Sequence, residues 1–582
     1  MPQSKIVIAN SRILGMLAEM ARLTLIEEAN PNSFKVRAYE NAIHGIEGTP
    51  AEVSSMSEAE LVKIKGVGGS IAQKIREFVD TGTVVKLDEL RHKYPPALVD
   101  LLRIPGLGPK TLITLRNELA VENLEDLQNA IAAEQLRTVP GLGKTTEEKI
   151  AQGIKRLGLH GKDRRTPIAD ALPMAEGLAA EISAIPGVEA AQYCGSLRRF
   201  AETIGDVDIV VGTRDAGAVM EFVATHPSAA QVLARGETKT SILTHRGMQV
   251  DVRTVAIEQF GAATLYFTGS KAHNIAMRQL AIDRGWLLSE YGLFEGDRVV
   301  ASHSEDAVYQ ALGLPYVEPP LRENAGELEA AAHAGLPDLV QVRDIKGDLH
   351  YHCDRSGDGR SSLEEMVAAA AGRKYQYLAI TDHGEDLAIN GSNRDEMLRH
   401  QKAILRLQEK YPKMRLLFGC ELNIGPDGGL DYDPDFRLRF DWCVASIHSH
   451  FDLPPSKQTE RLLRAMADPA VSVIGHLTGR YIGRRPGVEL ELDAVLEGLA
   501  ETGVGLEVNG ALDRLDASSE VIRRAVAREV NLVISTDSHH VSDLRRVQYG
   551  VLNAQRGWAP RAAVANTWPA RKFLAWASQR RT

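Results

Sequence analysis

Hydrophobic and polar positions follow three different patterns along the chain. Over residues 1–155 the apolar positions recur every three or four residues, which predicts helices. From about residue 160 to 320 the pattern is mixed, and the runs 206–212 (DVDIVVG) and 248–255 (MQVDVRTV) alternate as strands do. After residue 347, short apolar runs alternate with helical segments, which is typical of parallel strands covered by helices. We therefore predict a multidomain chain with an all-α beginning, an α/β middle and a barrel at the end.

The helical region contains one repeated unit. The segments LVKIKGVGGSIAQKI, LLRIPGLGPKTLITL and LRTVPGLGKTTEEKI begin at Leu61, Leu101 and Leu136, and each reads as helix, GxG turn and helix. Such a turn leaves free backbone N–H groups at the start of the second helix, where they bind phosphate without reading base sequence. One copy would only mark the end of a helix, but three copies favour contact with a DNA backbone. The glycines concerned are Gly66, Gly68, Gly106, Gly108, Gly141 and Gly143. The unit resembles the helix-hairpin-helix motif.

Carboxylates in the middle region suit a divalent metal. Asp206 and Asp208 are two residues apart on a predicted strand, so both point to one face, and Asp251 can join them from a neighbouring strand. Three such carboxylates can hold two Mg²⁺ or Mn²⁺ ions roughly 3.5–4 Å apart. Gly195 and Ser196 precede a predicted helix start and form a cradle for a triphosphate, and Arg199 can bind phosphate oxygens nearby.

The last region places ligand-type residues at the ends of its apolar runs. They are His350, His352, Asp358, His383, Glu421, His448, His476, Asp537 and His539. An isolated His-x-His pair is often chance, but nine such residues at or just after strand ends are the pattern of a parallel barrel with a site at its C-terminal face. Mixed imidazole and carboxylate ligands suit Mn²⁺, Zn²⁺ or Fe²⁺.

Composition narrows the class of protein. The chain has 582 residues and a net charge of −9, so any DNA contact must come from local patches or backbone amides. Its four cysteines form no CxxC pair, which favours a reduced compartment. No secretory segment or membrane-length apolar run is found, so we expect a cytoplasmic, nucleoid-associated protein with no membrane partner.

Two segments carry a resemblance to the family X DNA polymerases of bacteria and archaea. GSLRRFAETIGDVDIVV, at 195–211, resembles their nucleotidyltransferase signature, and the segment 266–294, which begins YFTGSKAHN, is similar to their nucleotide-binding thumb. By this resemblance Tyr266 and Phe267 exclude ribonucleotides, and Asn274 and Arg278 contact the base edge and the template. Gly269 shapes the turn beneath the sugar, and Arg165 reaches the triphosphate.

The segments 34–42 and 66–82 look like the lyase domain of the same family. The resemblance implies that Lys74 forms a Schiff base with the sugar aldehyde at an abasic site, with Lys35 as a helper on the phosphate side. A lysine needs a lowered pKa for that reaction.

The last region resembles the PHP (polymerase and histidinol phosphatase) domain, a distorted (βα)7 barrel with up to three Mn²⁺, Zn²⁺ or Fe²⁺ ions. The resemblance implies that His350, His352, Glu421 and Asp537 hold one metal, that Glu421 bridges to a second held by His448 and His476, and that Asp358, His383 and His539 hold a third. A water activated by metal would then attack a phosphodiester.

These expectations define six segments and one function. The segments are 1–85 (lyase-like), 86–158 (helix-hairpin-helix fingers), 159–262 (nucleotidyltransferase palm), 263–322 (thumb), 323–340 (linker) and 341–582 (PHP). The function is repair synthesis by a monomer that uses dNTPs on gapped, nicked or abasic DNA, with 3′→5′ exonuclease, 3′-end or abasic-site processing and lyase activities. Two alternatives are a nucleotidyltransferase–phosphatase acting on small molecules and a non-catalytic scaffold for DNA ends.

Overall fold

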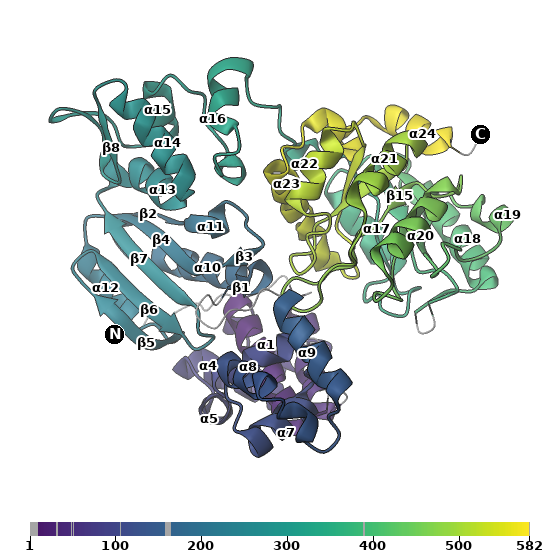
Figure 1. Cartoon of the computed structure of the whole chain (residues 1–582), viewed down its shortest axis with the longest axis horizontal. Helices are drawn as coiled ribbons and strands as arrows, with labels where there is room; N and C mark the ends of the chain where they lie inside the picture. The colour runs from purple at the N-terminus through teal and green to yellow at the C-terminus, as the bar shows by residue number, and fades with distance from the viewer. Residues whose placement is uncertain are drawn as a thin grey trace. The chain divides into compact units, whose positions relative to one another are not determined.

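The chain forms two compact units. The computed structural model describes residues 10–580 except 31–32, 48, 50–51, 105, 157–164 and 388–389, so the predicted boundary at 158/159 lies outside the described residues. Unit 1 comprises Met1–Asn324 with Gly483–Arg485, and unit 2 comprises Ala325–Ile482 with Pro486–Thr582. Figure 1 colours unit 1 from purple to teal and most of unit 2 from green to yellow. Among the described helices, none combines the length and the apolar character needed to span a bilayer.

The first part of unit 1 is helical, as predicted. Its helices are α1 Asn10–Glu28, α2 Phe34–Glu47, η1 Val53–Ser55, α3 Glu58–Leu61, α4 Gly69–Thr81, α5 Val85–Lys93, α6 Pro96–Asp100, η2 Leu101–Arg103, α7 Pro109–Leu119, α8 Leu124–Ala132, η3 Leu136–Thr138 and α9 Lys144–Arg156. A single core that includes Leu17, Ile75 and Leu112 joins them.

The three hairpins share one backbone form. Their first glycines, Gly66, Gly106 and Gly141, have φ between 84° and 92°, which a side chain rarely adopts. The second glycines precede α4, α7 and α9, and an added Cβ at Gly68, Gly108 or Gly143 would meet open space. The hairpins therefore present bare backbone at three helix starts.

A five-stranded sheet follows in the order β2-β4-β7-β6-β5 (Figure 1). Its strands are β2 Val188–Tyr193, β4 Asp206–Thr213, β5 Ala229–Arg235, β6 Lys239–Thr244 and β7 Gln249–Val255. β4 and β7 run parallel, and the other neighbours are antiparallel. α10 Ile168–Ser183 contacts β2 and β4, and α12 Ala216–Ala224 contacts β5, β6 and β7. The pair β1 Thr166–Pro167 and β3 Thr203–Ile204 lies beside α10 and the short helix α11 Gly195–Arg198.

The rest of unit 1 is a small α/β layer packed on that sheet. Its elements are η4 Ile257–Gln259, α13 Phe260–Thr268, α14 Lys271–Ile282, β8 Leu287–Ser289, β9 Gly292–Glu295, β10 Arg298–Ala301, α15 Glu305–Ala311 and η5 Pro319–Leu321. Buried Glu305 pairs with Arg198 at 2.7 Å and with Arg322 at 2.6 Å, which ties this layer to α11. The predicted linker 323–340 contains the helical turns α16 Glu327–Glu329 and η6 Ala330–Ala334.

Unit 2 is a nearly closed barrel of seven parallel strands in sequence order. The strands are β11 Gly347–Asp348, β12 Tyr377–Ile380, β13 Arg415–Asn423, β14 Trp442–Ser446, β15 Val473–Ile474, β16 Gly505–Asn509 and β17 Leu532–Ser535. A single bridge, Tyr351 to Ser538, links the first and last strands just beyond their ends. The helical elements are η7 Val342–Asp344, α17 Leu363–Gly372, α18 Arg394–Lys410, α19 Pro434–Arg437, α20 Pro455–Ala467, α21 Leu492–Thr502, α22 Ser519–Val526, η8 Val541–Arg546, α23 Val547–Arg556, η9 Arg561–Ala563, η10 Ala565–Thr567 and α24 Ala570–Gln579.

Alternating strand residues build two apolar layers in this barrel. Leu378, Phe418 and Leu506 belong to the large core shared with the surrounding helices. Tyr377, Trp442 and Val533 belong to a second cluster that Phe573 of α24 completes. Because strand side chains alternate between faces, the second layer fills the barrel interior, and the site can form only near the C-terminal ends of the strands.

Candidate metal centres

The three palm aspartates meet on one face of β4 and β7. In the parallel register Asp208 lies opposite Asp251, and Asp206 lies one pleat away on the same face of β4. Asp206 is exposed and Asp251 is buried. Burial and the charges of Asp206 and Asp251 raise the pKa of Asp208 to about 6. Three carboxylates that repel one another in this way form a site that a divalent cation would neutralise.

Among the described side chains, Asp251 alone of the three aspartates forms an ion pair with a lysine or arginine. Its Oδ2 lies 2.6 Å from Nζ of Lys239, and its Oδ1 accepts a hydrogen bond from Nε2 of Gln249 at 3.0 Å. Burial alone would raise the pKa of Asp251, but the bonds from Lys239 and Gln249 lower it.

The expected phosphate cradle lies beside these carboxylates, with one difference from the prediction. Gly195 and Ser196 do not precede a helix but open α11, which is only four residues long. A Cβ at Gly195 would lie 3.1 Å from Oδ2 of Asp208, so the glycine allows a close approach. Arg199 donates to the Thr268 carbonyl at 2.6 Å and pairs with Glu323 at 3.0 Å. Arg165 donates to Oγ1 of Thr203 at 2.9 Å.

The thumb residues named from the resemblance form one cluster. The rings of Tyr266 and Phe267 meet edge to face with centroids 5.1 Å apart. Arg278 lies over Tyr266 at 5.3 Å, and Asn274 donates to the Tyr266 carbonyl at 2.7 Å. Gly269, with a φ of 63°, directly follows α13, and Ser270 separates it from α14.

The lysines expected for lyase chemistry lie on the surface of the helical region. Lys74 is partly exposed and donates to Oγ of Ser70 at 2.8 Å. Lys35 is exposed and pairs with Glu28 at 2.6 Å. The six hairpin glycines are exposed as well.

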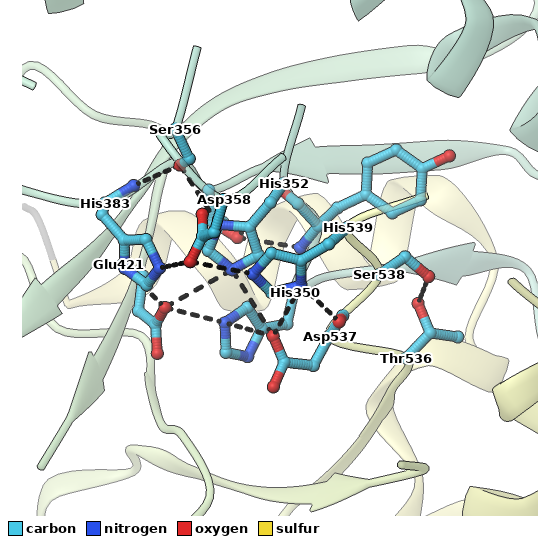
Figure 2. A network of polar contacts seen from close by, with 12 residues as sticks. His350, His352, Ser356, Asp358, His383, Glu421, Thr536, Asp537, Ser538 and His539 are labelled. Carbon is cyan, nitrogen blue, oxygen red and sulfur yellow. Dashed lines mark hydrogen bonds and ion pairs between the residues drawn. The ribbon is translucent and has the colours of Figure 1, made fainter. Parts of the chain in front are cut away.

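All nine predicted ligands of the barrel converge near the C-terminal ends of its strands. Glu421 lies at the centre: its Oε2 is 3.3 Å from Nε2 of His350 and 3.0 Å from Nδ1 of His383, and its Oε1 is 2.9 Å from Nε2 of His476. Glu421 also lies 3.2 Å from His448 and 3.4 Å from His352. Asp537 lies 3.5 Å from His352, 3.6 Å from His350 and 3.8 Å from His539. Figure 2 shows seven of the nine, His350, His352, Asp358, His383, Glu421, Asp537 and His539, pointing toward one another.

Four overlapping groups within this set bring three or four ligand atoms close enough to share one ion. They are His352 with Asp358, His383 and His539; His350 with His476 and Asp537; His350 with His352 and Glu421; and His383 with Glu421 and His448. The set predicted for the third ion, Asp358, His383 and His539, appears with His352 added. His448 and His476, which were predicted to share the second ion, fall into different groups.

The chemistry of the donors fits metal ions. Nε2 of His350, Nε2 of His352 and Nδ1 of His383 are buried without a hydrogen-bond partner, as is Oδ1 of Asp358. Unpaired buried polar atoms are costly, and a cation shared by them would remove that cost. Burial would lower the pKa of His350, but the carboxylates of Glu507, Glu421 and Asp537 raise it well above its usual range.

Several side chains that touch the ligands carried no signal in the sequence. Oδ1 of Asn423 lies 2.6 Å from Nδ1 of His448, and Oε1 of Glu507 lies 2.6 Å from Nδ1 of His350. Nε of Arg514 lies 3.7 Å from Asp537, its guanidinium stacks on Tyr481 at 4.3 Å, and its buried Nη1 has no hydrogen-bond partner. No motif spacing marks these residues. The one hint in the sequence was that Glu507 interrupts the apolar run VGLEVN at 504–509.

The fold and the two centres define a class: a DNA polymerase joined to a metal-dependent phosphoesterase. Four family models match, namely a helix-hairpin-helix domain over 8–84, a SAM-like helix-hairpin-helix tandem over 98–156, the DNA polymerase beta thumb over 263–323 and the PHP domain over 348–511. The DNA polymerase/3′-5′ exonuclease PolX of Bacillus subtilis (strain 168) is 37% identical over 546 residues, which are 93% of this chain and 95% of that protein. This chain therefore belongs to the PolX family.

Two further relatives each match one part of the chain. DNA polymerase lambda of Rattus norvegicus is 28% identical over 50% of this chain and 53% of its own length. A probable phosphatase of Acetivibrio thermocellus is 30% identical over 33% of this chain and 78% of its own length.

Proposed function

We propose that the protein repairs DNA by trimming 3′ ends with the barrel of unit 2 and filling short gaps with the palm of unit 1. The observation that supports it best is the presence of two complete donor sets of different chemistry, three carboxylates on β4 and β7 and nine mixed ligands in the barrel. Its substrates are dNTPs and gapped, nicked or abasic DNA, on which it acts as a monomer in the cytoplasm near the nucleoid.

For synthesis, Asp206, Asp208 and Asp251 hold two ions, Mg²⁺ or Mn²⁺. When bound, such ions activate the primer 3′-hydroxyl and neutralise the leaving pyrophosphate. Gly195 and Ser196 offer backbone N–H groups to the triphosphate, and Arg165 and Arg199 add charge.

Selection of the nucleotide falls to the thumb cluster. Tyr266 and Phe267 lie against the deoxyribose and leave no room for a 2′-hydroxyl. Asn274 and Arg278 line one small pocket with Tyr266, which supports a role for them at the base and template. Gly269 keeps the turn beneath the sugar free of a side chain.

For 3′-end trimming, the nine barrel ligands hold up to three ions, Mn²⁺, Zn²⁺ or Fe²⁺. When bound, such ions supply an activated water and offset the charge that develops on the phosphate. Glu421 spans the cluster, because its two oxygens face different histidines. Arg514 offers its unpaired Nη1 to a phosphate oxygen of the substrate.

The hairpins and the first helices hold the DNA. Backbone amides after Gly66, Gly68, Gly106, Gly108, Gly141 and Gly143 bind phosphates without base contacts, which suits a chain of net negative charge. Lys74 supplies the lyase nucleophile, and Lys35 assists at the phosphate once it leaves Glu28.

One substrate tests the whole proposal. A gapped duplex with a blocked 3′ end, incubated with dNTPs and Mn²⁺ and resolved by length, should first shorten and then extend. An Asp206→Ala/Asp208→Ala variant should stop after shortening. If that variant, still folded, also fails to shorten the primer, the two-site proposal is wrong.

A second candidate for the barrel is hydrolysis of phosphate monoesters, which the similarity to a probable phosphatase favours. A primer that ends in a 3′-phosphate distinguishes the two reactions. Release of inorganic phosphate alone supports the monoesterase, and release of nucleoside monophosphates supports the exonuclease.

A further inference from the structure

One strand of the barrel supplies no candidate ligand. β11, β12, β13, β14, β15 and β17 each carry one at or just beyond the C-terminal end, whereas β16 (Gly505–Asn509) carries none. Its residues Glu507 and Asn509 are nevertheless fully buried. Leu506 and Val508, which alternate with them along the strand, belong to the core shared with the surrounding helices. Glu507 and Asn509 therefore face the other side of the strand, the interior where the ligands lie.

Glu507 joins two ligand positions. Its Oε1 lies 2.6 Å from Nδ1 of His350, and its Oε2 accepts a hydrogen bond from the backbone N–H of His476 at 2.5 Å. In the neutral ring that can bind a metal, Nδ1–H is directed at Glu507 and the lone pair of His350 is on Nε2. That atom is buried without a hydrogen-bond partner and faces Glu421 at 3.3 Å and Asp537 at 3.6 Å. Glu507 therefore selects both the tautomer and the orientation of the His350 ring.

Asn509 performs the same task for a carboxylate. Its Nδ2 donates to Oδ2 of Asp537 at 3.2 Å and to Oε2 of Glu507 at 3.4 Å. This leaves Oδ1 of Asp537 turned toward Nε2 of His350 and of His352, at 3.6 and 3.5 Å. Strand β16 thus fixes ligand atoms that come from β11, β15 and β17.

The burial of Glu507 has no explanation in packing alone. Within the described part of the chain, the polar side-chain contacts of Glu507 are to the His350 imidazole, a backbone amide and an asparagine amide, and none is to lysine or arginine. A fully buried carboxylate without such a counter-ion is expensive, and an apolar residue of similar size would avoid that cost. Among the described side chains, the one cationic partner in contact with Glu507 is His350 when its ring is protonated, and a cation bound at Nε2 of His350 would replace that proton.

We propose that Glu507 and Asn509 are positioning residues that set the metal affinity of the barrel, an inference that rests on its proposed metal-dependent nuclease function. Hydrogen-bonded partners of metal ligands of this kind typically contribute about 10- to 100-fold in metal affinity.

The test measures Mn²⁺ retention in the full chain. Asp206→Ala/Asp208→Ala serves as the background, so that bound Mn²⁺ reports the barrel alone. Glu507→Gln should retain Mn²⁺ about 10- to 100-fold less tightly against a graded chelator. Glu507→Ala should retain less still, because glutamine can accept the His350 hydrogen bond and alanine cannot. Glu327→Gln is the matched control: this equally buried carboxylate accepts a bond from the Ala325 N–H and belongs to no ligand group.

A second readout separates positioning from a general loss of structure. In the Co²⁺-loaded protein, Glu507→Gln should shift the visible absorption bands, whereas Glu327→Gln should leave them unchanged. Asn509→Ala probes the same network without removing a charge, and should weaken Mn²⁺ retention even if Glu507→Gln does not fold. Parental retention in the folded Glu507 and Asn509 variants overturns the inference, while a parent chain that binds no Mn²⁺ overturns the proposed nuclease function with it.

Discussion

The palm and the barrel build metal centres in opposite ways. The palm needs only two neighbouring strands, whose register brings Asp208 opposite Asp251, and it leaves Asp206 exposed. The barrel draws eight of its nine ligands from the ends of six strands and the ninth, Asp358, from the loop after β11. It buries most of them and backs them with residues such as Asn423 and Glu507. We expect a centre of the first kind to take its ions together with its substrate, and a centre of the second kind to hold its ions between turnovers.

The two centres also differ in the charges that surround their carboxylates. In the palm, burial and then the charges of Asp206 and Asp251 raise the pKa of Asp208 to about 6, so the empty site is unfavourable by itself. In the barrel, Glu421 is surrounded by imidazoles, and although burial would raise its pKa, His350, His448 and His383 lower it well below its usual range. The barrel carboxylates therefore have positive neighbours before any ion binds, whereas the palm carboxylates depend largely on the ion.

The comparison is tested most strongly by removing the palm carboxylates. Asp206→Ala/Asp208→Ala should reduce primer extension by about 10³-fold or more, because several kcal/mol of charge stabilisation are lost. Trimming of 3′ ends should change little, since no barrel ligand is altered. Both rates are measured on one labelled primer, with and without dNTPs, and a comparable loss of trimming would mean that the centres are not independent.

Withdrawal of metal should affect the palm before the barrel. After brief treatment with a chelator and its removal, extension should fall by more than about 100-fold and return at once on addition of Mg²⁺. Trimming should persist, because the barrel ligands are buried and fixed by their partners. Equal loss of both activities in a time course would contradict the distinction between an open and a prebuilt centre.

Removal of one supporting residue should lower only the barrel activity. Asn423→Ala takes away the oxygen that lies 2.6 Å from Nδ1 of His448, and trimming should fall about tenfold. Extension of the same primer is the internal control. In the palm, the described supporting side chains Lys239 and Gln249 both contact Asp251.

The contrast also explains what the sequence could predict. The palm triad follows from two rules, the alternation of side chains on β4 and the pairing of β4 with β7, so Asp206, Asp208 and Asp251 could be named in advance. The nine barrel ligands could be named because each follows an apolar run. The supporting residues could not be named in advance. Glu507 and Asn423 belong to buried strands, where residue spacing does not distinguish a partner of a ligand from a core residue.

In the polymerase half, too, the sequence could not show which side chains pair with one another. GSLRR contains two arginines, and only the structure separates them: Arg198 is bound to Glu305, whereas Arg199 reaches Thr268 and Glu323. The helix expected after Gly195 and Ser196 begins at Gly195 itself, because the positive φ of 62° there turns the chain directly from β2 into α11.

The smallest effect concerns stability without metal. The folded-state pKa of Asp208, about 6, lies above its ordinary value of 3.8, so the folded chain binds this proton more tightly than the unfolded chain. The cost of the charge is therefore fully present above pH 6 and disappears as the pH falls toward 4. Asp208→Asn should raise the free energy of unfolding of metal-free unit 1 by roughly 1–2 kcal/mol at pH 7.5, a value reduced for partial solvent screening, and by almost nothing at pH 4. Thermal melts of the chelated full chain at both pH values measure this difference. An equal gain in the free energy of unfolding at both pH values would show that Asp208 is destabilising for a reason other than its charge. The electrostatic difference between the palm and the barrel would then be smaller than the pKa of Asp208 indicates.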